Sequence, residues 1–131
     1  MGLGVYPATH KRFLGMLGMH GTYQANMSMH NADLIIAIGA RFDDRITNTP
    51  KLFAPNAKII HLDVDYSSVS KIIEANIAVF GQVKNSLLEM IKLLEVKKEL
   101  IDPKKILPWK KQISDWKSQH GLNHEMHLCE T

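Results

Sequence analysis

Asp33-Leu34-Ile35-Ile36-Ala37-Ile38-Gly39 is the stretch that decides the fold of this 131-residue chain. A short β-branched run that ends at a glycine is typical of a strand in a parallel sheet, and we expect it to be buried on both faces. Two further stretches have the same character: Lys58–Val64 ends in acidic residues, and Ile77–Phe80 ends at Gly81. The three stretches together predict a parallel sheet.

Helical patterns lie between and after these strands. Thr22 is a good N-cap residue, and a helix is expected to follow it with Ala25, Met29 and Ala32 on one face. The polar segment 41–56 predicts a connection with one helical turn near Leu52 and Phe53.

Two longer helices are predicted in the second half of the chain. The first begins at Val83, where apolar residues recur at helical spacing. These residues are Val83, Leu87, Met90, Ile91 and Leu94. The last is expected after Pro108, with Trp109, Ile113 and Trp116 on one stripe and lysines opposite.

The order of these elements predicts an α/β fold, a Rossmann-like parallel sheet flanked by helices. Three strands make a thin sheet, and the chain opens in a loop over residues 2–21 that holds five of its eight glycines. We therefore expect a domain truncated at its N-terminal side. Exchange with a neighbour or packing in a homo-oligomer would cover the exposed edge of the sheet.

The composition excludes several classes of protein. With 45% hydrophobic and 22% charged residues, the chain is not collagen-like, of low complexity or disordered. No apolar run could span a membrane, no secretory signal is visible, and one cysteine, Cys129, fits a reducing compartment. We therefore expect a cytoplasmic protein that does not bind membranes.

The net charge of +3 does not predict a nucleic-acid partner. Most of the excess comes from lysines between Lys92 and Lys117, which form a solvated helical face rather than a concentrated basic stripe. A histidine-rich end, with His120, His124, His127 and Cys129, resembles a zinc site but lacks a Cys-x-x-Cys pair, so we expect no metal site.

Ligands of parallel sheets bind beyond the carboxyl ends of the strands, so the loops there hold the candidate residues. The usual dinucleotide glycine fingerprint is absent. Asp63 at a strand end suits ribose hydroxyls, Gly21 before a helix lets amides approach a phosphate, and Arg41 suits a pyrophosphate. A structural interpretation is open for each, and the two arginines and two aspartates of Arg41–Arg45 would then pair with each other.

Several motifs occur in a fixed order along the chain. They are Gly2–Pro7, Phe13–Tyr23 with its Gly-Met-His-Gly, Ala25–Asp33, Arg41-Phe42-Asp43-Asp44-Arg45 and His61–Asp65. This order closely resembles the central domain of the catalytic large subunit of acetolactate synthase, also called acetohydroxyacid synthase. The resemblance covers about residues 1–118, an incomplete FAD-binding-type domain, and leaves 119–131 as a C-terminal tail or linker.

The resemblance implies a transferase of branched-chain amino-acid biosynthesis, the route to valine, leucine and isoleucine. In that family a hydroxyethyl group derived from pyruvate, carried on thiamine diphosphate, condenses with a second 2-oxo acid. The central domain holds FAD in a structural role, and thiamine diphosphate and magnesium bind to the other domains. A homo-oligomer and a regulatory small subunit are further partners that it implies. No catalytic residue is expected in this chain, which would be inactive alone.

The resemblance also implies site residues, position by position. The cofactor contacts are Gly18, Met19, His20, Gly21, Ala40, Arg41, Asp43, Arg45, Asp63, Val64, Gly81, Gln82 and Val83. The substrate-channel residues are Met19, Asp44 and Arg45, and Arg45 would receive the carboxylate of the second 2-oxo acid. Gln82 stands where the family usually has an acidic residue.

Two other functions remain open on the residues alone. The chain can be a non-catalytic nucleotide-binding or oligomerisation scaffold of the same fold. It can also be a module that uses the same strand ends for NAD, which the missing fingerprint disfavours.

Overall fold

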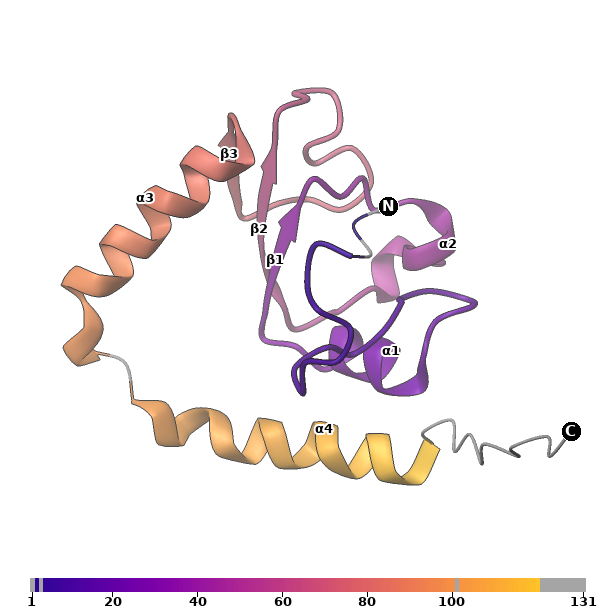
Figure 1. Ribbon diagram of the computed structural model, residues 1–131. Helices are drawn as coiled ribbons and strands as arrows, with labels where there is room; N and C mark the ends of the chain where they lie inside the picture. The colour runs from indigo at the N-terminus through magenta and orange to yellow at the C-terminus, as the bar shows by residue number, and fades with distance from the viewer. Residues whose placement is uncertain (1, 3, 101, 121–131) are drawn as a thin grey trace, which may run out of the picture.

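The computed structural model describes residues 2, 4–100 and 102–120. Three parallel strands form one sheet in the order β1-β2-β3 (Figure 1). They are β1 (Leu34–Ile38), β2 (Lys58–Asp63) and β3 (Ile77–Phe80). The predicted α/β fold with a parallel sheet is thereby confirmed.

In the described part of the chain, four α-helices accompany the sheet: α1 (Tyr23–His30), α2 (Asp44–Thr47), α3 (Val83–Val96) and α4 (Leu107–His120). Short 3-10 helices occupy Pro50–Leu52, Lys98–Leu100 and Pro103–Ile106. The turn expected near Leu52 is confirmed, whereas α2 falls inside the segment that we expected to be a connection.

Helix α1 begins where its capping residue predicts. The hydroxyl of Thr22 accepts a hydrogen bond from the amide of Ala25 at 3.3 Å, which satisfies one of the free amides of the first turn. The helix ends at His30, earlier than predicted, because the side chain of Asn31 also donates to the carbonyl of Met27, at 2.8 Å, and the amide of Ala32 turns to the carbonyl of Met29 instead of making the next helical bond. Ala32 therefore lies outside it.

The core lies on one face of the sheet. Its buried residues are Ala37, Phe42, Ile59 and Ile73, with Phe53 packed against them. Side chains alternate along a strand, so the residues between them point to the opposite face.

On that opposite face Leu62 of β2 is buried, but the row of β1 is exposed, so the prediction that β1 is buried on both faces is wrong. Leu34, Ile36 and Ile38 are 48%, 42% and 44% exposed. Strand β1 is an edge strand, and α3 leaves the end of β3 and runs on the far side of the sheet from α1 and α2 (Figure 1). No residue of α3 is fully buried: Val83, Leu87 and Met90 are half-buried near β2, and the second half of the helix is exposed.

Helix α4 packs along α1 rather than on the sheet (Figure 1). The rings of Tyr23 and His120 lie 4.0 Å apart, and the ammonium of Lys117 donates to the carbonyl of Phe13 at 3.2 Å. The helix starts at Leu107, slightly earlier than predicted, because a first helical turn accepts Pro108, which has no N–H to lose.

The helices of the described ranges are too short or too polar to cross a lipid bilayer.

Candidate functional site

The carboxyl ends of the three strands form one continuous edge. The amide of Gly39 donates to the carbonyl of Leu62 at 2.9 Å, and the amide of Gly81 donates to the carbonyl of Asp63 at 3.1 Å. The loops that carry Arg41, Asp63 and Gln82 therefore leave the sheet side by side. Parallel sheets bind ligands at this kind of edge.

Open backbone is available at this edge. Gly39 has a φ of +60°, and a Cβ there would meet no heavy atom within 4 Å. Gly81 has a φ of +146° and lies directly before α3, whose N-cap residue Gln82 makes no side-chain capping bond. The first amides of a helix have no partner within the helix, so the start of α3 can receive a phosphate.

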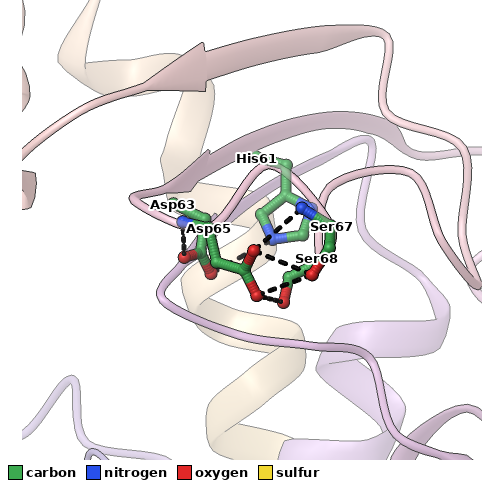
Figure 2. Close-up of polar contacts among 5 residues, drawn as sticks. All are labelled: His61, Asp63, Asp65, Ser67 and Ser68. Atoms are coloured by element: carbon green, nitrogen blue, oxygen red, sulfur yellow. Dashed lines mark hydrogen bonds and ion pairs between the residues drawn. The ribbon is translucent and has the colours of Figure 1, made fainter.

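Asp63 is the buried carboxylate of the edge (Figure 2). One of its oxygens, Oδ1, accepts the amide of Asp65 at 2.9 Å, and the other, Oδ2, lies 3.9 Å from Nε2 of His61. Val64, which follows, is 61% exposed. This carboxylate is held in place by its own loop.

Asp65 organises the turn that follows β2 (Figure 2). Its carboxylate accepts the hydroxyl and the amide of Ser67 and the hydroxyl of Ser68, at 2.8 to 2.9 Å. Those hydrogen bonds, with the Ser67 hydroxyl first, hold the pKa of Asp65 below its ordinary value. Asp65 is therefore ionised at neutral pH and shapes the loop beside Asp63.

An aromatic pair adjoins Asp63, and sequence reasoning missed it. The rings of Tyr66 and Phe80 stack with centroids 3.7 Å apart and an interplanar angle of 2°. Phe80 lies opposite Asp63 in the register of β2 and β3, and Tyr66 is 74% exposed. An aromatic residue at the last position of the third strand is the one signal that could have suggested it.

The Arg41–Arg45 loop contains one ion pair instead of the two that the structural interpretation requires. Arg41 donates to Asp43 at 3.1 Å, with both side chains at least half exposed. Arg45 forms no ion pair with any residue that the structure describes. Such an exposed pair is worth little, so Arg41 can exchange its partner for an anionic ligand.

A pocket of about 740 Å³ brings together part of the predicted site. Three segments line it: the loop around Met19, one side of α1, and the chain from α2 to Ala54. The lining residues are Leu17, Gly18, Met19, Asn26, Met27, Met29, His30, Asp44, Arg45, Ile46, Thr47, Asn48, Leu52, Phe53 and Ala54. All three predicted substrate-channel residues, Met19, Asp44 and Arg45, are among them.

Backbone contacts fix the loop that forms one wall of this pocket. Asn26 binds both backbone groups of Gly18: Oδ1 accepts its amide at 2.8 Å, and Nδ2 donates to its carbonyl at 2.9 Å. The amide of Met19 donates to the carbonyl of Arg45 at 3.2 Å. Gly18 has a φ of +95°, and a Cβ there would overlap that same carbonyl oxygen. Only glycine fits this approach without strain.

The other predicted cofactor residues lie elsewhere. Gly18 lines the large pocket, whereas His20 and Gly21 line a separate pocket of about 430 Å³ with Lys117 and His120 of α4. Ala40, Asp43, Val64 and Gln82 belong to the loops at the strand ends, and Val83 is the first residue of α3. Asn26, which holds Gly18, was not predicted, although it stands in the Ala25–Asp33 motif.

The possible zinc donors His124, His127 and Cys129 lie outside the described residues. Within the ranges 4–100 and 102–120, no three histidine, cysteine or acidic side chains gather as metal ligands would.

Comparison with known proteins identifies related chains. Residues 1–90 match the family described as thiamine pyrophosphate enzyme, central domain. The chain is 46% identical over 127 residues to the acetolactate synthase isozyme 3 large subunit of Escherichia coli (strain K12), covering 97% of this chain and 22% of that protein. It is 56% identical over 94 residues to the acetolactate synthase large subunit of Haemophilus influenzae, covering 72% and 16%.

A plant relative shows the same pattern. Acetolactate synthase 3, chloroplastic, of Brassica napus is 46% identical over 99 residues, covering 76% of this chain and 15% of that protein. The chain spans about a fifth of the length of the first relatives that it matches. The resemblance to acetolactate synthase large subunits is confirmed, and the chain belongs to the central-domain family of the thiamine pyrophosphate enzymes.

Proposed function

We propose that this chain supplies the FAD-contacting and substrate-channel loops of an acetolactate synthase large subunit. The whole enzyme would condense a hydroxyethyl group derived from pyruvate with a second 2-oxo acid, on the route to valine, leucine and isoleucine. Residues 1–118 would be the central-domain part, and 119–131 a tail or linker. The names of the relatives and the match to the central-domain family support this proposal.

The observation that carries it is the pocket shared by Met19, Asp44 and Arg45. Arg45 lines this pocket and forms no ion pair with another described residue. A planar guanidinium of this kind suits the carboxylate of a 2-oxo acid. One oxygen of Asp44 accepts the backbone amide of Arg45 at 3.0 Å, so this carboxylate is bound to the chain and does not pair with the guanidinium.

The residues at the strand ends fit FAD. Asp63 would hold the ribose of the adenosine end, with Val64 beside it. The open backbone at Gly39 and Gly81 leaves room for phosphate groups, and Arg41 would meet their charge. The remaining contacts would come from Gly18, Met19, His20, Gly21, Ala40, Asp43, Arg45, Gln82 and Val83. FAD would serve a structural role here and carry no electrons in the net reaction.

Thiamine diphosphate and magnesium would bind to other parts of the enzyme, so we expect the chain alone to be inactive. Purified chain would be incubated with pyruvate, thiamine diphosphate, magnesium and FAD, and acetolactate measured. Any turnover above background would refute the expectation.

A chimera tests the positive half of the proposal. This chain would replace the matched 127-residue segment of the Escherichia coli isozyme 3 large subunit. We expect the chimera to bind FAD and to form acetolactate. A chimera that folds and assembles but neither binds flavin nor turns over would contradict the proposed function.

A second candidate function, an oligomerisation scaffold, is favoured by the exposed edge of the sheet at β1. Leu34, Ile36 and Ile38 form an exposed apolar row on an edge strand, which other proteins cover by association. A homo-oligomer is the partner that we propose first, and a regulatory subunit the second, both in the cytoplasm. Light scattering of the eluting chain measures its mass, and a monomer at every concentration would exclude the scaffold.

A further inference from the structure

His61 is a fully buried imidazole in the middle of the sheet. None of its surface is exposed. Neither Nδ1 nor Nε2 has a hydrogen-bond partner among the described residues. A buried polar group without a hydrogen-bond partner destabilises a fold. Such a group in a native protein therefore calls for a structural or functional explanation.

Apolar residues of both neighbouring strands and one aromatic ring lie around the imidazole. Its register partners are Ala37 of β1 and Ala78 of β3, and the ring of Phe42 lies at 88° to it with centroids 5.2 Å apart. Asp63, two residues further on the same face of β2, is the one acidic group of the described chain within 4.0 Å. Asp63 is therefore the one described carboxylate close enough to interact with the imidazole.

The two oxygens of Asp63 have different surroundings (Figure 2). Oδ1 accepts the amide of Asp65 at 2.9 Å, whereas Oδ2 lies 3.9 Å from Nε2 of His61 and accepts no hydrogen bond from the described residues. The distance between Nε2 and Oδ2 exceeds the length of a hydrogen bond by less than about 1 Å. A small rotation of the Asp63 side chain closes it.

We propose that His61 is a positioning residue for Asp63. Its Nε2–H donates to Oδ2 while the amide of Asp65 holds Oδ1, and together they fix the plane of the carboxylate at the strand end. The inference rests on the proposed function, which gives Asp63 the ribose of the adenosine end. A neutral imidazole carries hydrogen on one nitrogen, so this role requires the Nε2–H tautomer.

Nitrogen-15 NMR of the full chain tests the contact without a ligand. Two-bond nitrogen–proton correlations distinguish the tautomers of His61, once it is assigned through the backbone. We expect Nε2–H in the wild type and a changed tautomer pattern in Asp63→Ala. Nδ1–H in the wild type overturns the proposal by itself, so the result does not depend on whether a variant folds.

Binding of ADP and its 2′-deoxy and 3′-deoxy forms tests the consequence by calorimetry. We expect the wild type to favour ADP over at least one deoxy form by about tenfold, the size of one hydrogen bond to a charged group. His61→Met should lose that preference, and His61→Gln, which keeps an amide donor, should retain it. An unchanged preference in a folded His61→Met would overturn the proposal.

The two readouts separate this inference from the proposed function. If the Nε2–H tautomer is found but ADP does not bind, the His61–Asp63 contact is supported and the proposed nucleotide site at this edge is contradicted. ADP binding together with the Nδ1–H tautomer supports nucleotide binding at this edge and excludes the hydrogen bond between His61 and Asp63.

Discussion

Replacing Gly18 by alanine tests whether the backbone contact with Arg45 holds the pocket wall. The new Cβ would overlap the carbonyl oxygen of Arg45, and a φ of +95° is strained for any residue with a side chain. We expect about 1–2 kcal/mol from the backbone angle. Losing the hydrogen bond from the amide of Met19 to the carbonyl of Arg45 should add about 1 kcal/mol to this destabilisation. The free energy of unfolding should therefore fall by about 2–3 kcal/mol.

The assay is urea denaturation followed by circular dichroism, with Gly4→Ala as the matched control. Gly4 has a similar φ of +103°, but a Cβ there would meet nothing within 4 Å. The control should lose no more than about 1–2 kcal/mol, the cost of the backbone angle alone. Equal losses in the two variants, or no loss in Gly18→Ala, would refute the reasoning.

Three further predictions concern the same region and the turn after β2. Asn26→Ala removes both side-chain bonds to the backbone of Gly18, and urea titration should show a loss of about 1–3 kcal/mol. Wild-type stability in this variant would show that the two hydrogen bonds from Asn26 to Gly18 do not stabilise the fold. In the chimera, Arg45→Ala should raise the KM for the second 2-oxo acid about tenfold or more while bound flavin, measured by absorbance, stays constant; an unchanged KM would contradict that role. Asp65 has a lowered pKa, so the stability that it contributes is present above its ordinary value of 3.8 and is lost as the pH falls through the lower folded value. The melting temperatures of wild type and Ser67→Ala should therefore differ at pH 6 and converge by about pH 2. A difference that stays constant over this range would disprove the coupling between Asp65 ionisation and stability.

The strands could be predicted because each is a short apolar run closed by a residue that interrupts it. The β-branched run of β1 identified a strand correctly but not its environment. Burial depends on what covers each face, and Leu34, Ile36 and Ile38 lie at the edge of a face that the described helices cover only over β2. Periodicity shows which residues share a face and cannot show whether another element lies over it.

The candidate site was predictable where short motifs carry it. Met19, Asp44 and Arg45 belong to two such motifs, and the fold brings both to one pocket. The stack of Tyr66 on Phe80 could not be predicted, since it depends on the register between segments distant in sequence. The unpartnered nitrogens of His61 depend on the same register and on the ring of Phe42 above them.

Arg45 contributes only its main-chain carbonyl to the contact with Gly18 and Met19. The guanidinium therefore has no part in holding the wall together. If Arg45 receives the carboxylate of a 2-oxo acid as proposed, substitutions at position 45 would change which small molecules bind and would leave this backbone contact intact, whereas position 18 has no such freedom. Under that proposal, substrate selectivity and folding stability depend on different atoms of the same contact and can evolve independently.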